Sequence, residues 1–189
     1  MTMKKMVTMA LLAGLLALPS VARNVPQATG GAKANPSESQ IVLAQWNESA
    51  RKLIAMAEDF PEDKYDYKAT PAVRSFAEQL LHAAGAMYYF TAPVQGQTPP
   101  SEEPSRAKYK TKADVVAYLK KAAEDGAAAI KSKGDKGMID LVTDPDSKQT
   151  LHVSDMAYGL IEHSGEHYGQ LVVYYRLNGL VPPESRPKK

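Results

Sequence analysis

The chain has 189 residues, with 23 Lys and Arg residues, 21 Asp and Glu residues, and no cysteine. Without cysteine it can form neither a disulfide nor a lipid-modified cysteine, so stability must come from a packed core, with or without a metal. The basic residues are interspersed with acidic ones and form no stripe that could follow phosphates, which argues against nucleic acid as a partner. The glycines form no phosphate-binding motif.

Residues 1–22 have the pattern of a signal peptide. Lys4 and Lys5 form a basic start, an apolar run follows from Val7 to Leu18, and small residues precede an expected cleavage after Ala22. We therefore expect a periplasmic or secreted protein. Removal of the two lysines leaves 21 basic and 21 acidic residues, so the mature chain is formally neutral.

The apolar run of the leader is too short to span a bilayer, and no later stretch approaches the roughly 20 apolar residues of a transmembrane helix. Residues 23–36 are rich in Gly, Ala, Pro, Asn and Gln without periodicity, so we expect a flexible linker. Residues 37–186 suit one domain with a substantial core. The sequence predicts no membrane span.

Helical periodicity begins directly after the linker. A helix is expected from a cap at Ser37 to Phe60, because the proline that follows disfavours further helix. A second helix is expected from an S-x-x-E capping box that begins at Ser75, and it should continue to Pro93. This assignment places His82 in the middle of the second helix.

Two further helices are predicted by the same periodicity. The third should run from about Thr111 to Gly134, with apolar residues on one stripe and lysines opposite. The last should run from a cap at Ser154 to Gly179, with prolines beyond its end. Four long amphipathic helices in one small domain predict an all-α four-helix bundle.

The segment before the last helix has no helical pattern. Turn residues mark residues 135–153, where Ile139 to Val142 could pair with Thr150 to Val153 as a short hairpin. His152 lies in this hairpin and is interpreted as a surface residue rather than a ligand. The expected architecture is therefore a helical bundle with a short hairpin before its last helix.

The remaining three histidines suggest a metal site. His163 and His167 lie one turn apart on one face of the last helix, so both imidazoles can point at one ion. His82 is the only other helical histidine and could supply a third ligand from a neighbouring helix. Three imidazoles would leave room for water or substrate, as in reactive zinc sites. Histidines that are simply packed in the bundle give the same pattern.

Glu166 lies beside His167 and has several candidate roles. It could be a further ligand, a hydrogen-bond acceptor for a ligand, a general base, or simply a solvated carboxylate. The sequence His163-Ser-Gly-Glu-His167 is not the H-E-x-x-H motif, in which the glutamate directly follows the first histidine. The pattern therefore argues against a zinc peptidase.

Two stretches of the sequence resemble the DinB/YfiT-like superfamily. They are the second-helix segment SFAEQLLHAA and the last-helix segment IEHSGEHYGQLVVYYR, which continues to NGLVPP. The resemblance covers about residues 37–186. It implies an up-down-down-up four-helix bundle, a zinc or nickel ion on His82, His163 and His167, and frequent homodimers. Some members are thiol-dependent transferases or isomerases that use cytosolic thiols, whereas this chain carries an export signal.

Three functions fit these observations. The first is a metal-dependent enzyme that acts on a small-molecule substrate, with the three histidines as ligands of a divalent metal ion. The second is a non-catalytic metal-binding or interaction protein of the cell envelope, in which the ion ties two helices together. The third is a structural bundle with packed histidines. The sequence contains no feature specific to one substrate.

Overall fold

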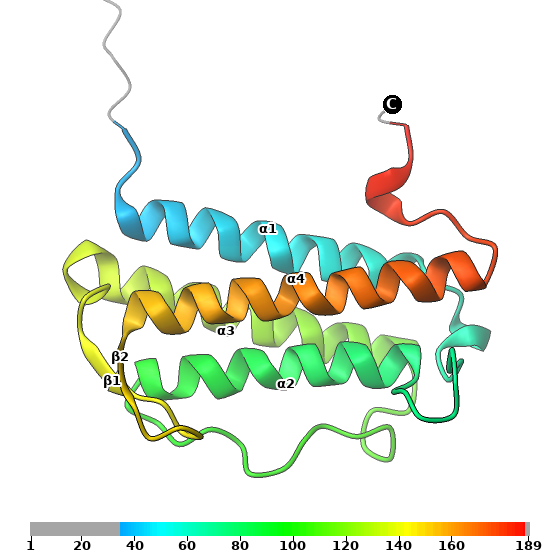
Figure 1. The fold of residues 1–189 in the computed structure, drawn as a ribbon, viewed down its shortest axis with the longest axis horizontal. Helices are drawn as coiled ribbons and strands as arrows, with labels where there is room; N and C mark the ends of the chain where they lie inside the picture. The colour runs from blue at the N-terminus through cyan, green and yellow to red at the C-terminus, as the bar shows by residue number, and fades with distance from the viewer. Residues whose placement is uncertain (1–34, 188–189) are drawn as a thin grey trace, which may run out of the picture. The chain divides into compact units, whose positions relative to one another are not determined.

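The computed structural model describes residues 35–187. The predicted signal peptide, residues 1–22, and most of the predicted linker, residues 23–36, lie outside the described residues. Within the described part, four long helices form an up-down-down-up bundle (Figure 1), which confirms the predicted all-α class. The helices are α1 (Glu38–Asp59), α2 (Phe76–Val94), α3 (Lys112–Gly137) and α4 (Val153–Leu177).

The four helices form two diagonal pairs, α1 with α2 and α3 with α4. Both α1 and α2 pack against α3 and α4, so α1 lies diagonally across from α2. Residues 95–111, the α2–α3 loop, run back along the length of the bundle, and α3 therefore runs in the same direction as α2 (Figure 1). This long loop places additional side chains beside α2.

The predicted starts of the first two helices are confirmed. The Ser37 amide donates to the Gln40 side chain, with an N–O distance of 2.9 Å. At the second helix the Ser75 hydroxyl accepts from the Glu78 amide at 3.2 Å, and the Glu78 carboxylate accepts from the Ser75 amide at 2.6 Å. These reciprocal bonds satisfy amides that the first turn of a helix leaves free.

Two helix boundaries differ from the prediction. The last helix is capped by His152, not Ser154, because the Ser154 amide donates to the Met138 carbonyl while the His152 amide donates to the Asp155 carboxylate. Gly134 has a φ of 56°, in the left-handed region, and interrupts the third helix as expected. One more helical turn nevertheless continues to Gly137.

The predicted hairpin forms, but Ile139 and Asp140 lie outside its first strand and Val153 begins α4. Strands β1 (Leu141–Thr143) and β2 (Thr150–His152) are antiparallel, and Leu141 lies opposite His152. Two short 3-10 helices, η1 (Glu62–Lys64) and η2 (Pro183–Ser185), complete the described elements. Among the described helices, none combines the length and apolar character needed to cross a membrane.

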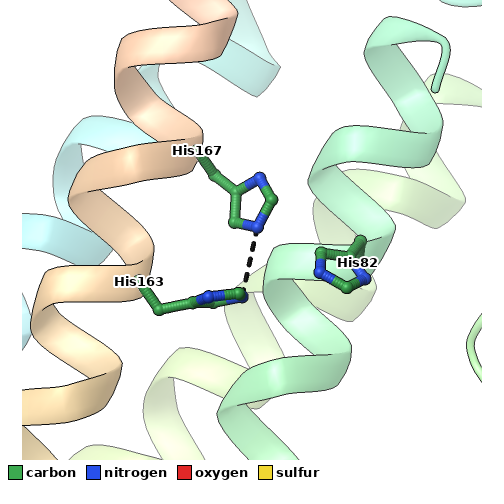
Figure 2. A group of neighbouring side chains, drawn as sticks. All are labelled: His82, His163 and His167. Atoms are coloured by element: carbon green, nitrogen blue, oxygen red, sulfur yellow. Dashed lines mark hydrogen bonds between the residues drawn. The ribbon is translucent and has the colours of Figure 1, made fainter. Parts of the chain in front are cut away.

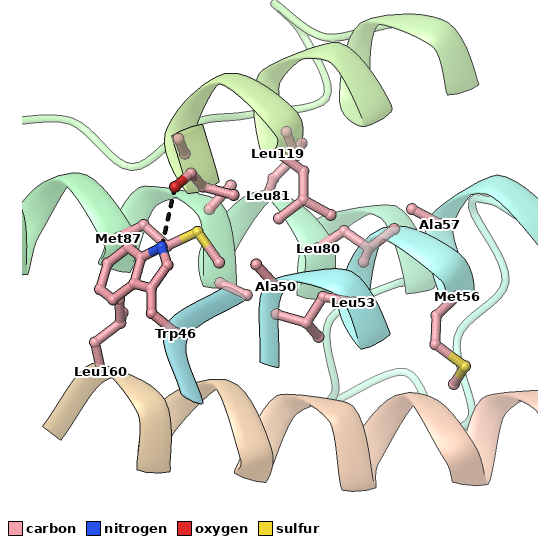
Figure 3. Packing of buried hydrophobic residues seen from close by; sticks show 14 of the residues in the cluster. Trp46, Ala50, Leu53, Met56, Ala57, Leu80, Leu81, Met87, Leu119 and Leu160 are labelled. Atoms are coloured by element: carbon pink, nitrogen blue, oxygen red, sulfur yellow. Dashed lines mark hydrogen bonds between the residues drawn. The ribbon is translucent and has the colours of Figure 1, made fainter. Parts of the chain in front are cut away.

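The core contains a close contact between α1 and α3. The indole of Trp46 is 1 % exposed and donates from Nε1 to the Ala123 carbonyl at 3.0 Å (Figure 3). Its ring packs on Gly126, where an added Cβ would lie 1.8 Å from the indole Cζ2 atom. Glycine is thus required at this position for the two helices to approach so closely.

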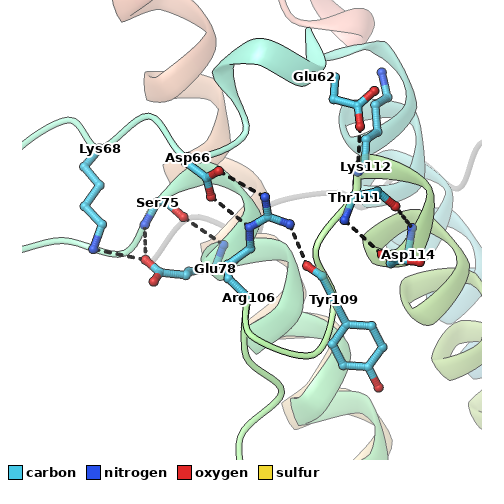
Figure 4. A network of polar contacts seen from close by, with 10 residues as sticks. All are labelled: Glu62, Asp66, Lys68, Ser75, Glu78, Arg106, Tyr109, Thr111, Lys112 and Asp114. Atoms are coloured by element: carbon cyan, nitrogen blue, oxygen red, sulfur yellow. Dashed lines mark hydrogen bonds and ion pairs between the residues drawn. The ribbon is translucent and has the colours of Figure 1, made fainter.

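Polar contacts fasten the α2–α3 loop to the end of the bundle (Figure 4). The Arg106 guanidinium donates to both carboxylate oxygens of Asp66, at 2.8 and 3.0 Å, and to the Tyr109 carbonyl at 2.6 Å. Two parallel bonds between guanidinium and carboxylate fix orientation as well as distance. The loop is therefore anchored close to where it approaches the histidines of α2 and α4.

Candidate metal centre

The bundle brings together three of the four histidines. His82 on α2 and His163 and His167 on α4 each offer one ring nitrogen, and the three atoms lie within 4.8 Å of one another (Figure 2). We call these residues the histidine triad. The α4 pair faces α2 because residues four apart share one face of a helix. The predicted set is thus assembled between two neighbouring helices.

The two α4 imidazoles already have the spacing of ligands to one ion. Their Nε2 atoms are 3.1 Å apart. Two nitrogens bound tetrahedrally to zinc at about 2.1 Å would be about 3.4 Å apart. His82 lies on the far side of the gap, with its ring centroid 4.8 Å from that of His167 and 5.4 Å from that of His163.

Gln79 orients the buried histidine. The side-chain oxygen of Gln79 lies 2.9 Å from Nδ1 of His167, and both residues are buried. An amide oxygen only accepts hydrogen bonds, so the His167 proton resides on Nδ1 and the lone pair is on Nε2. In the metal-free protein this lone pair accepts a hydrogen bond from Nε2 of His163, 3.1 Å away (Figure 2). This is the arrangement by which an outer hydrogen bond prepares a histidine for a metal.

Glu103, from the α2–α3 loop, orients His82 in the same way. One Glu103 carboxylate oxygen lies 2.6 Å from Nδ1 of His82 and 3.2 Å from the Arg74 guanidinium. The carboxylate can only accept when ionised, so it holds a proton on Nδ1 and leaves Nε2 free. Arg74 in turn holds the carboxylate in place.

Glu166 lies outside the triad. Its carboxylate is 3.9 Å from Nδ1 of His163 and its side chain is 61 % exposed. That separation exceeds a hydrogen bond, so Glu166 acts on His163 as a nearby negative charge. Among the roles predicted for Glu166, this exposed position fits a solvated carboxylate and not a ligand.

The electrostatic environment keeps the α4 imidazoles neutral. Burial lowers the pKa of His167 to about 4, and the neighbouring His163 and His82 act in the same direction. Burial also lowers the pKa of His163, with a further contribution from His82. Neutral imidazole is the form that binds metals, so protons compete weakly at these two positions near pH 7.

The metal-free protein should lose stability on acidification. His167 has a pKa near 6.5 in an unfolded chain and about 4 in the fold, so the unfolded state binds the proton first. Its contribution to stability is complete above pH 6.5 and is lost as the pH falls toward 4. Denaturant unfolding with chelator should show a loss of roughly 2 kcal/mol between pH 7 and 5. An equal loss in His167→Asn would assign the effect to other groups.

His152 lies apart from the triad. It is exposed, caps α4, and its Nδ1 atom lies 2.9 Å from the Ile139 carbonyl of the hairpin. The prediction that His152 is a surface residue of the hairpin is confirmed. It therefore serves as a matched control for substitutions of the triad.

A cavity of about 410 Å³ opens beside the triad, lined in part by His82 and His163. One wall is the α2–α3 loop, which packs so closely on α2 that a Cβ at Gly85 would lie 2.9 Å from Pro104. A volume of this size accommodates a small molecule. The open side of the triad therefore faces a ligand-sized space.

Sequence reasoning missed Gln79 and Glu103. Gln79 could have been found, because it lies three residues before His82 and so shares its face of α2. Glu103 carries no such signal, since it lies in an irregular loop whose path is set by tertiary contacts. The sequence thus predicted the three histidines that cluster but not the groups that orient them.

The protein is thus a four-helix bundle in which α2 and α3 run in the same direction. Its candidate metal centre consists of three histidines between α2 and α4. The family model for the DinB superfamily matches residues 45–171. The chain therefore belongs to the DinB superfamily, as its resemblance indicated.

Solved structures with the same fold agree with this assignment. A DinB-like protein from Bacillus cereus ATCC 10987 is 17 % identical with a TM-score of 0.65, covering 75 % of this chain and 93 % of its own. A DinB-like protein from Bacillus subtilis is 16 % identical with a TM-score of 0.62, covering 78 % and 99 %. At these identities the likeness shows the fold alone. A comparison with curated proteins finds no significant match.

Proposed function

We propose that this protein binds a zinc or nickel ion through His82, His163 and His167 and acts as a metal-dependent enzyme on a small molecule. The observation that carries the proposal is the orientation of the triad. Outer partners hold Nδ1 of His82 and His167, which leaves Nε2 of each ring available to an ion that would replace the hydrogen bond between His163 and His167. Neutral nitrogen ligands suit zinc and nickel, and three of them leave a coordination position open.

The residues around the triad have distinct parts in this proposal. When bound, the ion supplies a Lewis acid for an oxygen or sulfur atom of the substrate. Gln79 and Glu103 fix the imidazole orientations, and the cavity walls position the substrate and restrict water. Glu166 is not among the residues that line the cavity, which argues against it as the general base.

Two measurements on the purified protein test the proposal. Elemental analysis with native mass spectrometry should find about one zinc or nickel per chain, retained after dialysis and lost with chelator. Absence of metal in both the purified and the reconstituted protein would leave the packed-histidine interpretation. An ion that survives prolonged chelation and gives no access to small anionic probes would instead favour a non-catalytic, structural role.

Two further proposals concern the setting of the protein. The leader-like pattern of residues 1–22 supports export to the periplasm or beyond, and the family resemblance supports a homodimer. N-terminal sequencing of the protein from cells should begin at Arg23. Sedimentation should give twice the mass of the mature chain. An intact Met1 in a cytosolic fraction contradicts export, and a monomer at all concentrations contradicts the dimer.

A further inference from the structure

The cavity beside the triad has an uneven distribution of charge. Three carboxylates line it, those of Glu102, Glu103 and Asp146, whereas no Lys or Arg is found among its lining residues within the described chain. Glu103 is matched by Arg74 and His82. Glu102 and Asp146 are exposed and form no ion pair with any residue between 35 and 187. Two uncompensated negative charges therefore face this space.

The rest of the cavity wall is largely aromatic. Tyr89 and Phe90 from α2 and Tyr118 from α3 line it, together with Gly85 and Ala86. Ring faces attract both apolar groups and organic cations. The wall thus suits a flat or apolar body that carries a positive charge.

Tyr89 adds a polar group to this aromatic wall. Its hydroxyl oxygen is buried and faces the Asp146 carboxylate, but the pair does not reach normal hydrogen-bond geometry. Burial raises the pKa of Tyr89, and the nearby Asp146 carboxylate acts in the same direction, so the hydroxyl stays protonated. The Tyr89 hydroxyl therefore adds a polar group beside Asp146 in an otherwise apolar part of the wall.

We propose that the cavity selects an organic cation, namely an amine joined to an aromatic or similarly apolar body. The body lies against Tyr89, Phe90 and Tyr118, and the ammonium group is held by the negative field of Glu102 and Asp146. This inference rests on the proposed function, since it names the substrate class of the same site. Recognition of the amine, however, uses residues other than the metal ligands.

Isothermal titration of the full mature protein with three matched probes tests the inference. The probes are 2-phenylethylamine, 2-phenylethanol and 3-phenylpropanoate, which share the ring and differ in charge. The amine should bind about two- to fivefold more tightly than the alcohol, as one partly exposed ion pair provides. The carboxylate should bind most weakly to chelator-treated protein, in which no ion can attract it. The preference for amine should shrink as salt is raised.

Charge-neutralising variants locate the effect. Glu102→Gln and Asp146→Asn should each weaken amine binding about two- to fivefold and leave alcohol binding unchanged. Glu124→Gln is the control, because Glu124 is exposed and lies at a different groove, between α1 and α3. Circular dichroism verifies that each variant is folded.

The outcomes separate this inference from the proposed function. Equal binding of amine and alcohol, tighter binding of the carboxylate to metal-free protein, or no binding of any probe at millimolar concentration overturns the inference. An unchanged amine affinity in both cavity variants overturns it as well. Each of these results leaves the metal content untouched. Conversely, selective amine binding by a protein that takes up no metal would support the cavity assignment and contradict the proposed metal function.

Discussion

Replacing any one of His82, His163 and His167 by alanine is expected to abolish most of the stabilisation that zinc or nickel provides. Binding to the folded state alone adds RT ln(1 + [L]/Kd), so metal at a hundredfold over Kd should stabilise the protein by about 2.7 kcal/mol. Loss of one of three ligands empties the site. Double variants should therefore lose little more than single ones, which is a strong departure from additivity. Thermal unfolding with and without metal measures both effects.

The control for this prediction is His152→Ala, which should retain the full metal-dependent gain because His152 lies in the hairpin. Substitutions of the orienting residues should be intermediate. Gln79→Leu and Glu103→Ala leave all three ligands in place but release their rings, and a 10- to 100-fold loss of metal affinity is typical for such partners. If chelator does not change the melting temperature of the wild type, and each triad variant behaves like His152→Ala, the metal centre is refuted.

Gly126→Ala is expected to destabilise the protein even though alanine is the better helix former. The substitution should gain up to about 1 kcal/mol from helix propensity. Its Cβ would, however, lie 1.8 Å from the indole of Trp46, so α1 and α3 must separate or the indole must leave its rotamer. Overpacking of this kind costs typically about 1–3 kcal/mol and can cost more. The free energy of unfolding should therefore fall, as denaturant titration of metal-free protein can measure.

Two comparisons isolate the steric cause. Gly169→Ala on α4 is the matched control, because nothing lies within 4 Å of its added Cβ, and it should be neutral or slightly stabilising. In a Trp46→Leu background, Gly126→Ala should cost much less, since the ring that it meets is gone. Equal effects of Gly126→Ala and Gly169→Ala would show that the close contact between α1 and α3 does not form.

Much of the fold could be predicted because the information is local. Ser37 and Ser75 start helices through bonds to residues three positions later, and apolar periodicity identifies the buried faces. The predicted boundary at Ser154 was wrong because the Ser154 amide donates to the carbonyl of Met138, which is distant in the sequence. A local capping preference does not predict such a tertiary contact.

The residues of the candidate site also differ in whether local sequence predicts them. The pairing of His163 and His167 follows from their spacing alone. His82 lies beside them only because the bundle packs α2 against α4. Glu103 was invisible because its contact with His82 depends on the path of the α2–α3 loop. Candidate ligands on regular helices can thus be predicted from the sequence, whereas supporting groups on loops require the structure.

The distribution of the ligands over α2 and α4 sets the order of events in making the protein. Both α3 and the hairpin lie between them in the chain, so a nascent polypeptide has no centre until its last helix has been synthesised and docked. Bringing His82 and His163 together closes a long loop of chain, which is entropically unfavourable until packing of the helices offsets the cost. Under the proposed function an ion would therefore join a finished bundle, and a chain that crossed a membrane unfolded would take its metal from the compartment in which it folds.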